Sequence, residues 1–295
     1  MTDVPSPPAD PALLTRAPSS GLVIGAIASV QFGGALAVHL FGAVGPGGAV
    51  LLRLATASVV LFAVSRPQVR GRTRRELLLV AVFGLVLTAM NLGFYAAINR
   101  IPLGIAVSLE FVGPLAVAVG GSRRPVDLIW VALAAAGILA LTQGGGHGVN
   151  GLGVLFALGA GGAWGIYILV SGRVGRAFQG GAGLSLAMCF ATLLALPVGI
   201  ASGGAHLIEP RSLALGAAVG MLSSAIPYSF ELEALRRIAA PVFGVLMSLE
   251  PAMATLAGLV VLGQALSGRA LVGIALVIVA SVGASRRART AATDI

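Results

Sequence analysis

Ten long apolar runs constrain the fold of this 295-residue chain more than any other feature of its sequence. A helix needs about 20 apolar residues to cross the roughly 30 Å hydrocarbon core of a bilayer, where its backbone groups must be satisfied internally. The expected spans are 22–41, 46–64, 76–98, 103–121, 127–142, 151–170, 182–201, 212–230, 241–262 and 270–285. We therefore expect an all-α polytopic membrane protein with ten transmembrane helices.

Composition argues against the soluble classes of protein. Hydrophobic residues make up 57% of the chain and charged residues 10%, with a mean hydropathy of +0.99, whereas soluble domains average about 45–50% apolar and about 25% charged residues. The net charge of +9 comes from arginines that lie in short clusters between apolar runs, a pattern typical of membrane loops rather than of nucleic-acid binding. One cysteine, Cys189, and three widely separated histidines argue against a disulfide, a metal centre or a cofactor site.

The arginines also predict the orientation in the membrane. Fifteen of the nineteen fall in the tails and loops that share a side with the N-terminus, three fall in the opposite loops, and Arg53 lies inside a span. The positive-inside rule then places both termini in the cytoplasm. Residues 1–20 are rich in Pro, Ser and Ala and are predicted to be a disordered tail, and residues 287–295 a second cytoplasmic tail.

An internal repeat divides the spans into two halves. The segment AVSLEFVGPLAVA at 106–118 corresponds to LMSLEPAMATLAG at 246–258, an offset of about 140 residues. Each half, 21–143 and 150–286, then holds five helices. Because five is odd, the two copies enter the membrane from opposite sides, which is the inverted-repeat architecture of secondary transporters. We expect residues 22–142 to rock against 151–285 around a midplane cavity.

Two glutamates at membrane depth, Glu110 and Glu250, are candidates for binding a substrate ammonium or a coupling proton, because ionisable residues are costly there. Pro114 and Pro251 lie close by and interrupt helical hydrogen bonding. Arg53 lies at about the same depth as Glu110 and has the forked donors that suit a substrate carboxylate. The alternative is that these charges form permanent structural pairs or caps, and the sequence leaves both readings open.

Neutral polar residues form a stripe on the third span, at Thr88, Asn91, Tyr95 and Asn99, with counterparts at Ser224 and Tyr228. Such a stripe either lines a cavity or forms hydrogen bonds between helices. Gln31 and Trp164 are weaker candidates for the same cavity. Glu231 and Glu233, close to Arg236 and Arg237, are interpreted as surface ion pairs.

Three segments resemble a known family: VSLEFVGPLAVA at 107–118, GSRRPVDLIWVALAAAGI at 121–138, and ALRRIAAPVFGVLMSLEPAMATLAGLVVLG at 234–263. They are similar to proteins of the drug/metabolite transporter superfamily that contain two EamA domains, in the threonine/homoserine exporter branch. The resemblance implies export of small amino acids or related metabolites across the bacterial inner membrane by alternating access, driven by a proton or ion gradient. Many members have Gly-Glu where this chain has Gly263 and Gln264.

The sequence therefore predicts a secondary transporter without enzymatic activity. The expected partners are a small-molecule substrate, the lipid bilayer and a coupling proton or ion, without nucleic acid, for a monomer or homodimer. The alternatives are efflux of cationic or hydrophobic drugs by the same fold, or a membrane protein without flux, although no catalytic constellation favours the latter. The predicted substrate-binding residues are Glu110, Arg53, Asn91, Tyr95, Tyr228, Glu250, Gln31 and Trp164.

Overall fold

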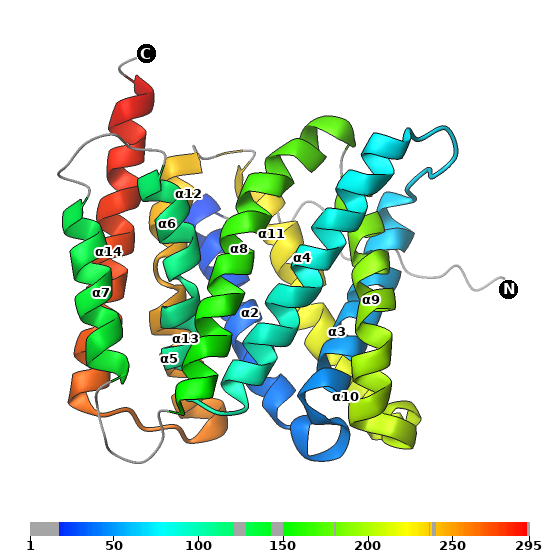
Figure 1. The fold of residues 1–295 in the computed structure, drawn as a ribbon, viewed down its shortest axis with the longest axis horizontal. Coiled ribbons are helices and arrows are strands. Elements are labelled where there is room, and N and C mark those ends of the chain that lie inside the picture. Colours follow the sequence, from blue (N-terminus) through cyan, green and yellow to red (C-terminus); the bar gives the residue numbers. More distant parts are fainter. Residues whose placement is uncertain are drawn as a thin grey trace, which may run out of the picture.

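The computed structural model describes residues 18–120, 128–142, 150–179, 181–235, 237 and 240–293, and every regular element in these ranges is helical (Figure 1). The elements are α2 (Ser19–Val38), α3 (Phe41–Ser65), α4 (Arg74–Ile98), α5 (Leu103–Glu110), α6 (Val112–Gly120), α7 (Leu128–Thr142), α8 (Gly151–Ala177), α9 (Ala182–Gly203), η2 (Gly204–Ile208), α10 (Pro210–Gly220), η3 (Met221–Ala225), α11 (Ile226–Leu235), α12 (Ala240–Met247), α13 (Glu250–Leu262) and α14 (Gly268–Thr293). Most of the predicted N-terminal tail, residues 1–17, lies outside the described residues.

These elements confirm the all-α polytopic membrane class. Six segments are long and apolar enough to cross a membrane, and the shorter apolar helices include α7 and most of α14. The predicted spans 103–121 and 241–262 each consist of two consecutive helices, α5 with α6 and α12 with α13, and the span 212–230 is built from α10, η3 and α11. Many large apolar side chains on these helices remain exposed, as expected for a surface that faces lipid.

Several helix boundaries differ from the predicted ones. The expected loop at 42–48 is largely helical because α3 begins at Phe41, with a kink where Gly45 has a φ of 67° before Pro46. A positive φ of this kind favours glycine. At the other end of the chain, α14 continues to Thr293, so the predicted tail that starts at 287 is helical through that residue.

The fourth span of each predicted repeat is broken near its middle. The first break separates α5 from α6 at Phe111, directly after Glu110 and three residues before Pro114, which has no N–H to donate to the Glu110 carbonyl. The second break separates α12 from α13, and Glu250 and Pro251 form the first turn of α13. Two predicted continuous spans, 103–121 and 241–262, are therefore pairs of half-helices with a glutamate at each break.

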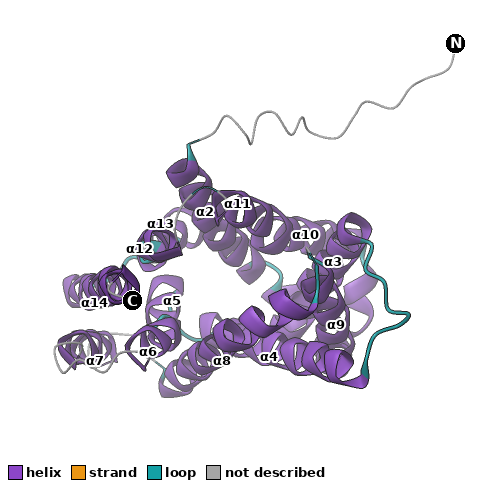
Figure 2. Ribbon diagram, turned by 90° about the horizontal axis from the view of Figure 1, so that it is seen from above, coloured by secondary structure: helices purple, strands orange, loops and turns teal. Residues whose placement is uncertain are grey.

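Helices of the two sequence halves are interleaved (Figure 2). The most extensive packing joins α3 to α9, α4 to α8, and α7 to α14, and α2 packs against α11 and α13. Each of these pairs takes one helix from either half of the chain. The expected rocking of residues 22–142 against residues 151–285 would separate these pairs. The motion itself stays a prediction.

The bundle has two ends, which we name by the chain. The terminal face is the end at which α2 begins and α14 ends, and it also carries the α3–α4 connection and the end of α8, at the top of Figure 1. The opposite face carries the α2–α3, α4–α5 and α13–α14 connections.

Candidate functional site

A central cavity of about 670 Å³ lies among helices from both halves of the chain. Apolar side chains such as Met90, Phe94 and Phe243 form much of its wall. The other side chains of the lining that carry hydrogen-bonding atoms are Gln31, Arg53, Asn91, Glu110, Trp164, Tyr167, Ser171, Ser223, Tyr228, Glu231, Glu250 and Ser281. A mostly apolar pocket with a few convergent polar groups is typical of a small-molecule site.

Arg53 is 9% exposed and is held by the ends of its guanidinium group. Nη2 donates to the carbonyl oxygen of Ser223 at 3.1 Å, and Nη1 donates to the hydroxyl of Tyr95 at 3.5 Å. The guanidinium carbon also lies 5.6 Å from the centre of the Tyr95 ring. The Nε–H has no hydrogen-bond partner within the described ranges. An arginine stays charged in a protein, so Arg53 presents a fixed positive charge and an unused donor.

A short π-helix, η3, explains why a backbone carbonyl is free to accept from Arg53. In this wide turn the carbonyls of two consecutive residues accept from side chains of other helices: Ser29 Oγ donates to Leu222 at 2.6 Å, and Arg53 donates to Ser223. Segments of π-helix are frequent at functional sites because they disturb the regular hydrogen-bond ladder. The local backbone of η3 therefore determines how the Arg53 guanidinium is oriented.

The two predicted carboxylates lie at the helix breaks and line the same cavity. Glu110 is 8% exposed and Glu250 is 7% exposed. Gln31 Nε2 donates to Glu250 Oε2 at 3.4 Å. A Cβ at Gly161 would lie 2.5 Å from the carbonyl oxygen of Glu110, so α8 approaches the break at backbone distance. Among the described residues no ion pair joins either glutamate to Arg53, which leaves opposite charges in one cavity without a permanent tie.

The neutral predicted residues occupy different positions relative to the cavity. Trp164 packs edge-to-face on Phe111 at a centroid distance of 5.3 Å, beside the first break. Asn91 lines the cavity. Its Nδ2 donates to the Leu87 carbonyl at 2.8 Å, so the side-chain oxygen Oδ1 remains available as an acceptor. Tyr228 also lines the cavity, as predicted. Tyr95 is 0% exposed and its hydroxyl accepts from Arg53, while its contact with a substrate stays a prediction.

The polar stripe on α4 therefore does two things. Asn91 faces the cavity, whereas Thr88 Oγ1 contacts the Ala191 carbonyl on α9 at 3.3 Å and joins two helices. Asn99 follows the last residue of α4 as its C-cap. The sequence allowed both cavity lining and helix–helix hydrogen bonding. In the structure Asn91 lines the cavity and Thr88 forms the hydrogen bond between helices.

The sequence did not identify four polar residues of the cavity wall: Ser171, Ser223, Glu231 and Ser281. Glu233 forms an ion pair with Arg237, as expected, but Glu231 lies on the cavity wall instead of in a surface pair. A signal was available, because Glu231 follows Tyr228 by three residues and therefore shares its helix face.

The opposite face is closed where α5 crosses α13. Gln264 Oε1 accepts a hydrogen bond from the backbone N–H of Leu103 at 2.9 Å, so a side chain after α13 caps the first turn of α5. Gly104 contacts Thr255 with no room for a side chain. Leu103 is fully buried. Gln264 thus joins the two broken spans at the opposite face.

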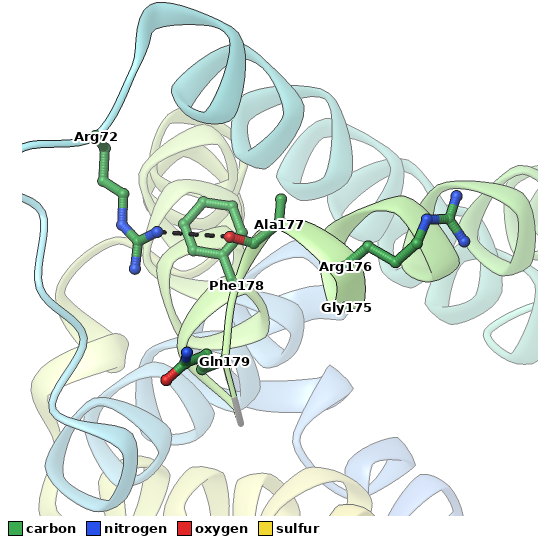
Figure 3. A pocket seen from close by; sticks show the side chains of 6 residues that line it. All are labelled: Arg72, Gly175, Arg176, Ala177, Phe178 and Gln179. Carbon is green, nitrogen blue, oxygen red and sulfur yellow. Dashed lines mark hydrogen bonds between the residues drawn. The ribbon is translucent and has the colours of Figure 1, made fainter.

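A second pocket, of about 560 Å³, lies on the terminal face (Figure 3). It is lined by Arg72, Gly175, Arg176, Ala177, Phe178 and Gln179. Arg72 donates to the Ala177 carbonyl at 3.5 Å, pairs with Glu76 at 3.1 Å, and lies 4.6 Å over the Phe178 ring. These contacts tie the α3–α4 connection to the end of α8. In the described part of the chain, no group of three metal-ligating side chains could hold a metal ion in either pocket.

Comparison with known proteins places this arrangement in a family. The EamA-like transporter family matches residues 151–286. The threonine/homoserine exporter RhtA of Escherichia coli strain K12 is 42% identical over 271 residues, 91% of each chain. RhtA of Salmonella typhimurium strain LT2 is 42% identical over 263 residues, 88% of each chain. A solved crystal structure with 23% identity shares the fold, with a TM-score of 0.61 over 93% of this chain and 99% of that chain. This chain therefore belongs to the EamA-like transporter family.

Proposed function

We propose that this protein is a secondary transporter that exports small amino acids of the threonine/homoserine type, or related metabolites. The observation that carries the proposal is the Arg53 guanidinium group in the lining of the same cavity as the carboxylates of Glu110 and Glu250. An α-amino acid carries a carboxylate and an ammonium on one carbon, and this cavity offers a charge of the opposite sign for each. The names of the relatives in Escherichia coli and Salmonella typhimurium point to the same cargo.

In this proposal each side chain has one task. Arg53 binds the substrate carboxylate through its guanidinium group, which Tyr95 and η3 hold in place. Glu110 or Glu250 binds the ammonium group. Asn91 Oδ1 accepts a hydrogen bond from the side-chain hydroxyl that threonine and homoserine share, since the bond to Leu87 fixes the amide orientation. The remaining predicted residues, Tyr228, Gln31 and Trp164, shape the wall around the bound molecule.

The cavity and the closed opposite face define one state of an alternating-access cycle. The lining includes residues near the terminal-face ends of their helices, such as Ser171 and Glu231, while the α5–α13 crossing closes the other end. The distribution of arginines favours a cytoplasmic terminal face and a location in the bacterial inner membrane. The described state then accepts cargo from the cytoplasm. One of the two carboxylates at the helix breaks carries the coupling proton or ion, and the repeats at 21–143 and 150–286 supply the two gates. The transporter acts as a monomer or homodimer.

Flux measurements in proteoliposomes test this proposal. We expect wild-type protein to release internal radiolabelled L-threonine and L-homoserine when a proton gradient is imposed. Arg53→Ala and Glu110→Gln should each slow this release at least tenfold, because each removes one of the two charges that hold the zwitterion. Arg173→Ala is the matched control, since Arg173 is exposed at the end of α8 and its Nη1 donates to the Leu169 carbonyl of its own helix. Wild-type rates in both cavity variants would contradict the proposal.

One observation favours a second cargo, a hydrophobic cation. Phe94, Phe111, Phe243 and Met247 give the cavity an apolar wall around its glutamates, and aromatic faces and carboxylates both attract cations. A panel of lipophilic cations and amino acids in the same vesicles separates the two. Release of the cations without release of amino acids would assign drug efflux. If the variants change a phenotype in cells but the wild-type protein produces no flux in vesicles, the protein has a role other than transport.

A further inference from the structure

We propose that Tyr167, Ser171, Tyr228 and Glu231, at the terminal-face end of the cavity, capture the ammonium group of the cargo on its way to Arg53. We name this group of four residues the vestibule. The inference rests on the proposed function and deepens it, because it assigns a first binding step before the cargo reaches Arg53.

The four residues occupy adjacent turns on two facing helices. Tyr167 on α8 and Tyr228 on α11 line the same cavity, and their side chains lie close enough to interact electrostatically. Ser171 follows Tyr167 by four residues and Glu231 follows Tyr228 by three, so each lies on the same helix face as its tyrosine, one turn closer to the terminal face. All four line the central cavity. Phe83 on α4 stacks on Tyr167 at a centroid distance of 5.1 Å and fixes the tyrosine ring.

Distance along the helix separates the vestibule from the site at Arg53. The Arg53 guanidinium is anchored on the Ser223 carbonyl, and Glu231 lies eight residues further along the same span. At a rise of 1.5 Å per residue this separation is about 12 Å. Because the two charges of an α-amino acid sit on a single carbon, a molecule whose ammonium group is held at Glu231 lies nearer the terminal face than one held at Arg53.

The environment of Glu231 differs from that of the next glutamate on its helix. Glu233 accepts from Arg237 Nε at 2.9 Å. Glu231 lies on the cavity wall and has no hydrogen bond or ion pair among the residues that the structure describes. An uncompensated carboxylate at the mouth of a low-dielectric cleft concentrates cations, and the faces of Tyr167 and Tyr228 add to that attraction. A cation that enters from the terminal face meets Glu231 first and then Glu110 and Glu250.

Cysteine labelling tests the charge of the vestibule without requiring flux. In Cys189→Ala protein carrying Ser171→Cys, we compare the reaction rates of a trimethylammonium methanethiosulfonate and a neutral hydroxyethyl methanethiosulfonate, each normalised to a free thiol. Glu231→Gln should lower the cationic-to-neutral ratio about tenfold, whereas Glu233→Gln should leave it unchanged. Glu231→Asp keeps the charge and should keep most of the cationic-to-neutral ratio. A ratio retained in Glu231→Asp shows that a lower ratio in Glu231→Gln comes from the lost charge and not from unfolding. An unchanged ratio in Glu231→Gln would overturn the inference.

A kinetic experiment tests whether the vestibule serves the amino acid. Uptake of L-threonine into inside-out vesicles starts from the proposed cytoplasmic face. Glu231→Gln should raise the apparent KM several-fold and largely keep the maximal rate, because the capture step is weakened while the site at Arg53 is intact. A lowered labelling ratio with an unchanged KM would also overturn the inference. If wild-type protein moves no amino acid, the proposed function fails, and the labelling ratio still decides whether the vestibule attracts cations.

Discussion

Replacing Gln264 should weaken the closure of the opposite face. Among the described residues, Gln264 Oε1 is the acceptor for the backbone N–H of Leu103. Leu103 is 0% exposed and lies in the first turn of α5. The first N–H groups of a helix have no partner within the helix. Gln264→Met keeps the length of the side chain and removes the acceptor. The N–H of Leu103 is then buried without a partner for as long as α5 and α13 stay together.

The size of the effect follows from that lost bond. A buried donor left unsatisfied costs roughly 1–3 kcal/mol. Because the cost applies only while the crossing is closed, it shifts the equilibrium towards the open crossing by roughly 5- to 150-fold. Gln264→Glu is the matched variant. It keeps an acceptor at the same position and restores the residue of many similar sequences, so it should keep the crossing closed.

Hydrogen–deuterium exchange read by mass spectrometry measures this equilibrium directly, on the peptide that covers residues 99–110. Gln264→Met should speed exchange of this peptide by the factor given above, and Gln264→Glu should leave it at the wild-type rate or slower. A peptide from α9, which does not contact Gln264, reports global stability and should not change. If Gln264→Met exchanges at the wild-type rate, the side chain does not hold the crossing closed and the reasoning is refuted.

Three further substitutions have expected outcomes. Arg53→Lys keeps the charge and loses the planar fork, so the KM for L-threonine should rise about tenfold in flux assays. Gly161→Ala places a Cβ 2.5 Å from the Glu110 carbonyl oxygen and should abolish transport or lower the melting temperature, while Gly162→Ala, which meets nothing within 4 Å, should do neither. Arg72→Ala removes a cation–π contact of about 0.5–1 kcal/mol, so the melting temperature should fall slightly and flux should persist.

The spans and the charged members of the site could be predicted because each signal is local. An apolar run of about 20 residues predicts a transmembrane helix by itself, and Glu110, Glu250 and Arg53 stand out because charges are rare at that depth. The repeated Ser-Leu-Glu at 108–110 and 248–250 also located the two positions that the structure shows as helix breaks. These features need no knowledge of how the helices pack.

The remaining features depend on contacts between distant segments. Periodicity does not show that α3 packs on α9 and α4 on α8, so the sequence suggested two separate halves where the structure interleaves them. The π-helix η3 is stabilised by side chains of α2 and α3, which its own five residues do not reveal. Glu231 was assigned to the surface because arginines follow it in sequence, although the helix turns its side chain towards the cavity.

A thermodynamic cycle of four binding affinities tests the central claim, that Arg53 binds the carboxylate of a zwitterionic cargo. Calorimetry measures the affinity of wild-type and Arg53→Ala protein for L-threonine and for 1-amino-2-propanol, which is threonine without its carboxylate. The account predicts that loss of the carboxylate weakens binding to the wild type by at least about tenfold and changes binding to Arg53→Ala by less than about twofold. Equal losses in the two proteins would show that the carboxylate and Arg53 do not interact, and would contradict the account.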